Sequence, residues 1–532
     1  MEVKIPSEKE QFCSCPPTGY FDNFFTYGLL VVLSWAVPWS VFGEDCLPGG
    51  NLFGLIILID SCVLIGLLVS SIPLPKLPPL PPLLGMLLAG IALRNIPVIN
   101  VASYIDTNWS ATLRSVALTV ILVKAGLELD AGALKKMKGV CLRLSALPCL
   151  VEAVTCAVAC YLLLGFSWEW GFILGFVLGA VTPAVIVPSL LILQGNGLGI
   201  DQGIPTLVIA ASSFDDVLAI SGFSVVLGVA FSTVGSTEEV GLTNASVFTN
   251  ISTNELMTTT SSTEGGDSNA GELALMIFRG PLEMLGGVAA GAIIGIILWY
   301  VPNGKQKHST FNRTLLVFGV GILSIFGSRI AGFPGSGALA AIVAPFVAAF
   351  KWNETKVSVS NNMGVLWKIF EPIMFGLIGA EINIESMDAD IIGLGLAVLF
   401  IGLLFRTLTT FAAVLRAGLT LKEKIFVCFA WLPKATVQAA IGPVALDTAK
   451  KLNAPEEIQN IAEQILTIAV LSILITAPLG AATIGLSGPV LLRKQQVVNE
   501  GALPLNDQTA ICRLVEQERR IPADDGSETI EL

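Results

Sequence analysis

The chain has 532 residues, of which 53% are hydrophobic and only 13% are charged. A soluble protein carries about twice that share of charged residues, so the composition predicts an all-α polytopic membrane protein surrounded by membrane lipids. The net charge is −11, and the sequence has no basic stripe, which argues against a nucleic-acid partner.

The ten cysteines are scattered and lie mostly inside apolar segments, and the single histidine, His308, lies in a polar run. This pattern predicts small core residues instead of a disulfide framework or a zinc site. No cofactor is expected. No cleavable signal peptide is predicted, because about twenty acidic and polar residues precede the first apolar run.

Hydropathy, with proline and glycine as punctuation, predicts about fourteen transmembrane helices. The expected apolar segments are, in chain order, Phe24–Phe42, Leu52–Ile72, Leu80–Arg94, Ser110–Leu129, Val140–Leu164, Glu169–Leu193, Ile204–Phe231, Glu272–Val301, Thr314–Ile330, Ser336–Phe350, Met363–Ile384, Ile391–Leu415, Lys424–Leu446 and Ile461–Leu491. They form one transmembrane domain over residues 24–491, between an N-terminal stretch (1–23) and a C-terminal tail (492–532).

Basic residues predict how the segments are oriented. The loops after segments four, eight, ten and twelve carry clusters of lysine and arginine, and Arg493 and Lys494 follow segment fourteen. The loops on the opposite side are poor in basic residues, apart from Lys450 and Lys451. By the positive-inside rule both termini are cytoplasmic, and the Ser/Thr-rich loop 233–271 is extracellular. This loop holds glycosylation sequons at Asn244 and Asn250. The protein is expected in the plasma membrane, in endosomal membranes or in both.

Two segments carry glycine at every fourth position. The ladders are Gly171, Gly175 and Gly179 in segment six and Gly287, Gly291 and Gly295 in segment eight. Small residues at this spacing let two helices approach closely. The ladders therefore predict tight helix packing.

Three features recur in one order at nearly one spacing. They are the pair Glu128 and Glu381, 253 residues apart, the pair Glu152 and Arg406, 254 residues apart, and the breaks at Pro183 and Pro433, 250 residues apart. Seven segments separate the copies, so the two halves have inverted topology. Inverted repeats are the architecture of secondary transporters, whose binding site lies at the repeat interface.

The stretch Ile204–Phe231 is long enough to cross a bilayer as a helix, yet Asp215 and Asp216 lie side by side near its middle. A carboxylate at that depth costs several kcal/mol. The alternative is a buried hydrogen-bonded pair that only holds helices together. Two adjacent carboxylates in apolar surroundings favour a cation or proton site.

Proline predicts two interrupted helices beside the aspartates. Because proline lacks the amide that bonds back four residues, Pro183 frees the carbonyl of Gly179, and Pro433 similarly frees that of Phe429. Simple proline kinks are the alternative. Matching positions in the two halves favour two broken helices, with unpaired carbonyls near mid-membrane.

The predicted site combines carboxylates, hydroxyls and backbone groups. Its expected cation- and proton-binding residues are Asp215, Asp216, Ser212, Thr182, Ala180 and Val181. Such hard oxygen ligands suit small alkali cations, so Na⁺ is expected at Asp215 and Asp216. Two neighbouring buried carboxylates resist joint ionisation. A proton and a monovalent cation therefore compete for the same oxygens, and this competition gives antiport.

Four other charged residues lie in apolar segments. Glu152 and Arg406 are expected to pair, because a buried charge without a partner is costly. Lys434, at the second break, can neutralise the carbonyl ends of the half-helices and is expected to meet Glu381. A purely structural role for these pairs is the alternative. Arg406 keeps its proton at all accessible pH values, so it is not a carrier of the transported proton.

Several motifs together resemble the animal NHA-type sodium/proton exchangers of the cation/proton antiporter superfamily. They are SFDDVLAI, FEPIMFGLIGAEI, LTLKEKIFVCFAWLPKATVQAAIG and LSILITAPLG, and the similarity covers all fourteen segments. The resemblance implies an NhaA-like antiporter fold with two crossed broken helices. It also implies a homodimer, with core helices at about 140–231 and 391–491 and the remaining helices as a dimerisation scaffold.

The resemblance further implies exchange of Na⁺ or Li⁺ for H⁺ at Asp215 and Asp216, by alternating access. One residue departs from the pattern of similar bacterial electrogenic proteins, which have lysine where Arg406 stands. Because arginine does not release its proton, the expected exchange is electroneutral.

Other functions remain open from the sequence. A K⁺/H⁺ exchanger needs the same oxygens in a wider site, and a Na⁺-coupled organic-anion symporter can share the crossed-helix fold. An intramembrane aspartyl protease needs aspartates on separate helices, and here they are adjacent, so the protein is not expected to be an enzyme. The final residues, Ile530-Glu531-Leu532, suggest a PDZ-type partner, because such a C-terminus can add a strand to a PDZ domain.

Overall fold

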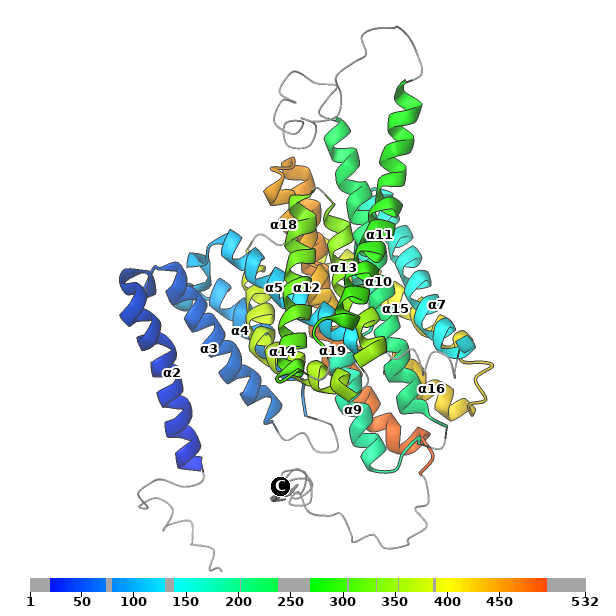
Figure 1. Cartoon of the computed structure of the whole chain (residues 1–532), viewed down its shortest axis with the longest axis horizontal. Helices are drawn as coiled ribbons and strands as arrows, with labels where there is room; N and C mark the ends of the chain where they lie inside the picture. The colour runs from blue at the N-terminus through cyan, green and yellow to red at the C-terminus, as the bar shows by residue number, and fades with distance from the viewer. Residues whose placement is uncertain are drawn as a thin grey trace, which may run out of the picture. The chain divides into compact units, whose positions relative to one another are not determined.

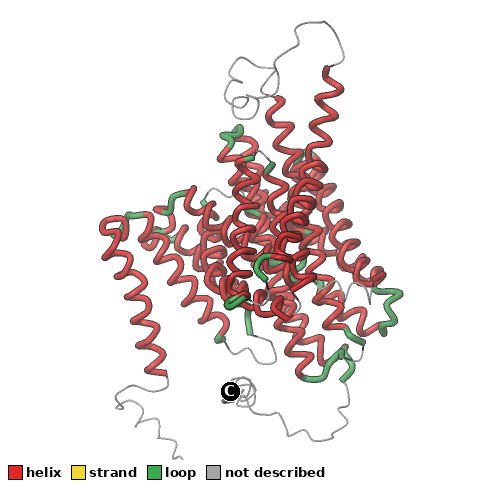
Figure 2. Tube along the Cα trace, in the orientation of Figure 1, coloured by secondary structure: helices red, strands yellow, loops and turns green. Residues whose placement is uncertain are grey.

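The computed structural model describes residues 20–72, 79–129, 138–200, 202–237, 268–303, 306–331, 333–352, 354–385 and 389–494. All regular structure in these residues is helical (Figures 1 and 2). The two predicted glycosylation sequons lie outside the described residues, as does the C-terminal tail beyond Lys494 with its PDZ-type sequence. These predictions therefore remain untested.

Each predicted apolar segment corresponds to one helix or to one interrupted helix. The helices are α2 (Tyr20–Phe42), α3 (Asn51–Ser70), α4 (Pro82–Asn95), α5 (Thr107–Glu128), α7 (Lys138–Ala159), α8 (Trp168–Leu178), α9 (Pro183–Gly195), α10 (Ile204–Thr237), α11 (Ser268–Tyr300), α12 (Ser309–Ile330), α13 (Pro334–Trp352), α14 (Glu354–Glu381), α15 (Ala389–Ala413), α16 (Leu421–Ala430), α17 (Thr436–Ile441), α18 (Val444–Lys451) and α19 (Glu456–Leu491). Ten spans of the described residues are long and apolar enough to cross a membrane, and three shorter helices are apolar. The total of fourteen crossings stays a prediction.

Several helices extend beyond the predicted apolar segments. Helix α10 continues to Thr237 and α11 begins at Ser268, so both ends of the predicted loop 233–271 are helical. Helix α14 begins nine residues before the predicted start at Met363. Hydropathy locates the apolar part of a helix, but polar residues can continue its backbone hydrogen bonds beyond that part.

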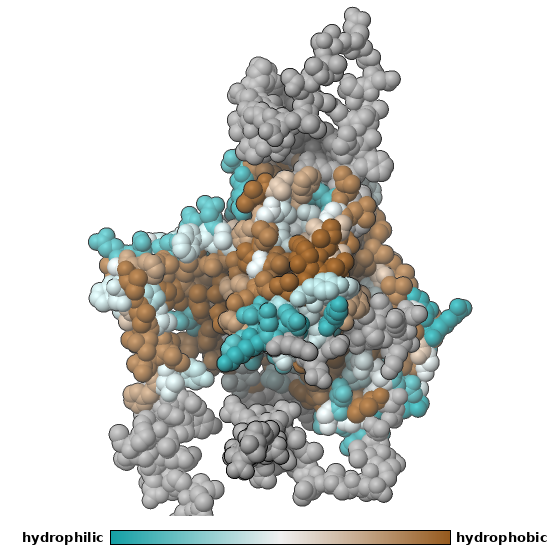
Figure 3. Space-filling view, in the orientation of Figure 1, coloured by the Kyte–Doolittle hydropathy of each residue, from teal (hydrophilic) through white to brown (hydrophobic). Residues whose placement is uncertain are grey.

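Large apolar side chains cover much of the described surface. In Figure 3 a broad hydrophobic band crosses the middle of the visible face, and hydrophilic residues gather above and below it. Exposed side chains include Leu30, Val41, Leu68, Leu162 and Ile330. Apolar patches of this size are rare on soluble monomers, whereas a bilayer favours them. The chain is a multi-pass membrane protein.

The two halves of the chain meet at equivalent positions. Glu152 on α7 contacts Arg406 on α15, and the hydroxyl of Thr182 contacts that of Thr436. Both pairs are 254 residues apart in the sequence. A residue near a two-fold axis contacts its own symmetry equivalent, so these contacts place both pairs near the pseudo-two-fold axis of the repeat.

The glycine ladders pack as predicted. A Cβ at Gly175 would lie 2.4 Å from the carbonyl oxygen of Ala153 on α7, and one at Gly287 would lie 2.4 Å from that of Ser336 on α13. Real Cβ atoms do not approach backbone oxygens so closely. Only glycine therefore permits these crossings of α8 with α7 and of α11 with α13.

Gly480 on α19 gives a testable packing prediction. A Cβ at this position would lie 2.2 Å from Cγ of Pro433, in the second helix break. We expect Gly480→Ala to destabilise the protein by about 1–3 kcal/mol, because a packed site cannot accept the added methyl group. The melting temperature of the purified protein in detergent measures this effect. Gly393→Ala is the control, since a Cβ there meets no atom within 4 Å; equal melting temperatures for both variants would contradict the packing account.

Candidate functional site

The first helix break lies between α8, which ends at Leu178, and α9, which begins at Pro183. Proline is favoured at the first position of a helix, where no amide donor is needed. The chain between the two helices leaves the last carbonyls of α8 without their usual partners. Side chains from the second half of the protein bind them instead.

Three side chains donate hydrogen bonds to four carbonyl oxygens at the end of α8. Arg406 Nη1 donates to Gly179 O at 2.5 Å, and Lys434 Nζ donates to Leu178 O. Gln438 Nε2 donates to Val177 O at 3.0 Å and to Ala180 O at 2.8 Å. The carbonyls that were predicted to be free are thus bound within the protein.

The second break lies between α16, which ends at Ala430, and α17, which begins at Thr436. The predicted release of the Phe429 carbonyl by Pro433 is wrong, because Leu432 N donates to Phe429 O at 3.4 Å in a tight turn. The carbonyl of Trp431 instead accepts a hydrogen bond from Arg406 Nε at 3.1 Å.

The two breaks are joined directly. The amide of Thr182 donates to the carbonyl of Pro433 at 3.0 Å. The hydroxyls of Thr182 and Thr436 lie 2.9 Å apart, and the amide of Thr436 also donates to Thr182 Oγ1 at 3.3 Å. These bonds fix the point where the two interrupted helices meet.

The aspartates lie on α10 beside this junction. Asp215 is 0% exposed and Asp216 is 6% exposed. Asp215 Oδ2 accepts a hydrogen bond from Arg406 Nη2 at 2.9 Å and another from the amide of Val181 at 2.7 Å. The Oδ1 atoms of Asp215 and Asp216 are buried, and neither has a hydrogen-bond partner among the described residues. Both oxygens are suited to accept a proton or a cation.

Four buried charges form a neutral group around the junction. Glu152 accepts from Arg406 at 2.5 Å and from Lys434 at 2.7 Å, and Arg406 also binds Asp215. Two positive and two negative charges therefore balance. Asp216 stands outside this balance, because none of the described ion pairs includes it.

The predicted pair of Glu152 and Arg406 is confirmed, whereas the predicted pair of Lys434 and Glu381 is wrong. Glu381 lies at the end of α14 and binds Arg114 of α5 at 2.8 Å. Lys434 is 0% exposed beside the first break, where Glu152 is the carboxylate within reach.

Sequence reasoning missed the cluster around Glu381. Arg114 also binds Asp447 of α18 at 2.6 Å, and Lys450 lies 3.7 Å from Glu381. This cluster joins α5 and α14 to α18. The available signal was Arg114, a charged residue inside apolar segment four. The residue 254 positions later is Lys368, which cannot pair with an arginine, so the repeat spacing did not indicate its partners.

The predicted ligands of the cation take different roles in the structure. Ser212 Oγ donates to Ile209 O at 2.9 Å, and Thr182 binds across the junction. Val181 contributes its amide to Asp215, while the carbonyl of Ala180 accepts from Gln438. The hydroxyl oxygen of Ser212 keeps acceptor capacity, while that of Thr182 already accepts from the amide of Thr436. A direct role for Ser212 and Thr182 in cation binding stays a prediction.

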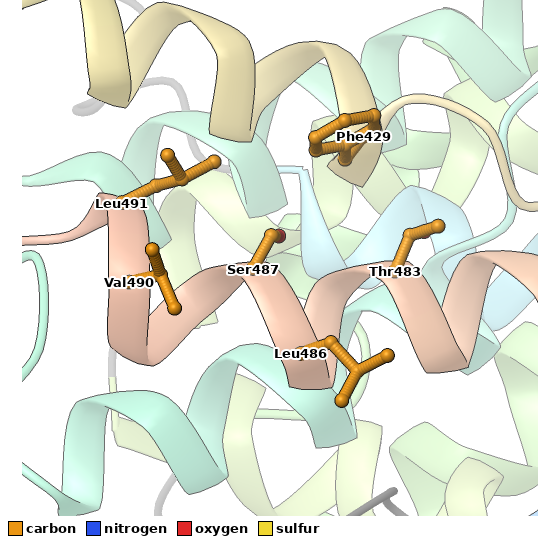
Figure 4. A pocket seen from close by; sticks show the side chains of 6 residues that line it. All are labelled: Phe429, Thr483, Leu486, Ser487, Val490 and Leu491. Carbon is orange, nitrogen blue, oxygen red and sulfur yellow. The ribbon is translucent and has the colours of Figure 1, made fainter.

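A surface groove of about 340 Å³ lies between α16 and α19. Phe429 of α16 and five residues of α19 line it, and Figure 4 shows their side chains around the opening. The lining is mostly apolar and includes none of the predicted site residues. The groove is therefore separate from the predicted ion site.

Two interrupted helices that meet beside buried carboxylates define a membrane transporter of the secondary type. Residues 61–487 match the family described as "Sodium/hydrogen exchanger, transmembrane". The chain belongs to the sodium/hydrogen exchanger family.

Relatives support this membership along most of the chain. Sodium/hydrogen exchanger 9B2 of Homo sapiens is 50% identical over 490 residues, which cover 92% of this chain and 84% of that protein. Sodium/hydrogen exchanger 9B1 of Homo sapiens is 42% identical over 493 residues, which cover 93% of this chain and 88% of that protein.

A solved structure shares the fold. The sodium proton antiporter MjNhaP1 from Methanocaldococcus jannaschii, solved at pH 8, has a TM-score of 0.60 and 18% sequence identity to this chain. The match covers 83% of this chain and 99% of that structure. It shows that the helices are arranged as in an antiporter.

Proposed function

We propose that the protein exchanges Na⁺ or Li⁺ for H⁺ by alternating access, with Asp215 and Asp216 as the shared binding site. Membership of the sodium/hydrogen exchanger family and the antiporter fold support this proposal. The observation that carries it is the buried carboxylate of Asp216, which lies beside a charge-neutral group of four residues. A single positive charge, from a proton or from an alkali cation, neutralises it.

Proteoliposomes that contain a pH-sensitive dye test the proposed exchange. When Na⁺ is added outside, Na⁺ enters and H⁺ leaves, so the lumen becomes alkaline. We expect this response with Na⁺ and Li⁺ and a much smaller one with K⁺. A larger response to K⁺ would identify a K⁺/H⁺ exchanger, and Na⁺-driven uptake of an organic anion without proton movement would identify a symporter.

We further propose that the exchange is electroneutral. Arg406 neutralises Asp215 directly and does not release its proton, so Asp216 is left to carry one proton or one cation in each direction. We expect no current when a Na⁺ gradient is applied across a membrane that holds the purified protein. Robust charge movement would contradict the one-for-one ratio.

The proposal also covers the topology, the location and the oligomeric state of the protein. We propose cytoplasmic termini, an extracellular loop at 233–271, and residence in the plasma membrane or endosomal membranes. Core helices at about 140–231 and 391–491 would move against the remaining scaffold helices, which would pair two protomers into a homodimer. Several apolar side chains of α2 are exposed, which is consistent with lipid or a second protomer around this helix.

A further inference from the structure

Gln438 lies at the centre of the junction between the broken helices. It is on α17, and its side chain is 1% exposed. It forms no ion pair, because it carries no charge, and the sequence analysis did not select it. Its side-chain amide nitrogen donates two hydrogen bonds to carbonyls at the end of α8, on the other half of the repeat.

One of these bonds replaces a helix bond. In a continuous helix the carbonyl of Val177 would accept from the amide of Val181, four residues later. Here Gln438 Nε2 donates to Val177 O at 3.0 Å. The amide of Val181 is thereby released from the helix, and it donates to Asp215 Oδ2 at 2.7 Å.

The second bond acts on the same peptide group. The carbonyl of Ala180 and the amide of Val181 belong to one planar peptide unit. Gln438 Nε2 donates to this carbonyl at 2.8 Å, while the amide on the other side of the unit holds Asp215. Hydrogen bonds in such a chain polarise and strengthen one another. The bond from Val181 to Asp215 therefore depends on Gln438.

We infer that Gln438 is a positioning residue for the exchange reaction: it holds the 180–181 peptide unit in the orientation that binds the ionised carboxylate of Asp215. This inference rests on the proposed function. Gln438 lies after the second break, yet it positions the peptide unit in the first break that binds Asp215. Both interrupted helices therefore control the same carboxylate.

The charged groups near Asp215 are few and come from several helices. Arg406 on α15 binds Asp215 directly, and Glu152 on α7 and Lys434 before α17 complete the ion pairs. Asp216 is its neighbour on α10, and the thiol of Cys149 on α7 is close enough to interact electrostatically. Because none of these groups replaces the amide of Val181, loss of Gln438 should weaken the hold on the ionised carboxylate of Asp215 and thereby the cation site that it shares with Asp216.

The test measures exchange in proteoliposomes over a range of pH and Na⁺ concentrations. Gln438→Leu removes both donors at nearly constant size. We expect the KM for Na⁺ to rise by about three- to tenfold, the range that one lost hydrogen bond gives. Without Gln438 the ionised form of Asp215 loses the hydrogen bond from Val181, so Asp215 also competes for protons beside Asp216, and the pH of half-maximal exchange should move upward by about half a unit. Gln438→Asn keeps the amide on a shorter arm and should show a smaller change in the same direction.

Two controls separate positioning from general damage. Gln459→Leu removes one partly buried glutamine hydrogen bond to a backbone carbonyl, from Nε2 to Ala454 O at 2.8 Å, in a region away from the junction, and should leave KM and the pH midpoint unchanged. A residue with only a structural role would lower the yield or the maximal rate and leave both values unchanged. Wild-type KM and midpoint in a folded Gln438→Leu or Gln438→Asn protein would overturn the inference. Absence of exchange in the wild type would instead overturn the proposed function.

Discussion

Sodium–proton exchange should fall below detection when Asp216 is replaced by asparagine. Asp216 is buried, and its Oδ1 atom has no hydrogen-bond partner among the described residues. An amide of the same shape cannot carry the negative charge for which a proton and a cation compete. The measurement is Na⁺-driven pH change in proteoliposomes with equal amounts of folded wild-type and variant protein.

Asp215→Asn should impair exchange severely, by at least about 100-fold, because it leaves the buried guanidinium of Arg406 with one carboxylate fewer. Asp60→Asn is the matched control. Asp60 lies on another apolar helix, α3, where it accepts a hydrogen bond from Ser34 at 2.6 Å, and its replacement should leave exchange intact. Full activity in both site variants would remove the aspartates from the mechanism.

Replacing Glu152 by glutamine should cause a large loss of stability. Glu152 is the carboxylate that binds both Arg406 and Lys434, at 2.5 and 2.7 Å, and all three side chains are almost completely buried. The variant leaves an uncompensated positive charge in the core. We expect a loss of about 3–5 kcal/mol, as for other buried ion pairs from which one partner is removed, and a correspondingly lower melting temperature.

Glu128→Gln provides the comparison for this prediction. Glu128 also binds a lysine, Lys124, at 2.6 Å, but the two side chains are 39% and 29% exposed. Pairs with this degree of exposure contribute at most about 1 kcal/mol, so the melting temperature should change little. A Glu152 variant as stable as the Glu128 variant would show that the buried charges do not hold the junction together.

Much of the fold could be predicted because hydropathy and repeat spacing act over long stretches of chain. The 254-residue spacing made Glu152 and Arg406 equivalent positions of the repeat, and the cost of an unpaired buried charge then predicted their pairing. The same spacing relates Thr182 to Thr436. Adjacent aspartates inside an apolar helix predicted buried carboxylates near the helix breaks, because a carboxylate at that depth costs several kcal/mol and favours a functional site. The charged residues could be read in this way because a membrane interior strongly disfavours charged side chains.

Pairing and backbone detail could not be predicted in the same way. Glu381 was the expected partner of Lys434, but Lys434 binds Glu152, and the spacing of the repeat does not say which end of the bundle each glutamate reaches. The missing amide of proline predicted where the helices break, but it did not predict which groups bind the carbonyls at the breaks. Side chains more than 200 residues away bind them, and local sequence carries no information about that approach.

Proton release on cation binding tests the central claim most directly. Purified protein in weakly buffered detergent solution is titrated with NaCl while the pH is recorded, with KCl as the comparison. Competition at Asp216 predicts that Na⁺ releases protons, that K⁺ releases far fewer, and that Asp216→Asn releases none. Na⁺ binding detected by a rise in melting temperature, without any release of protons from the wild type, would contradict the account.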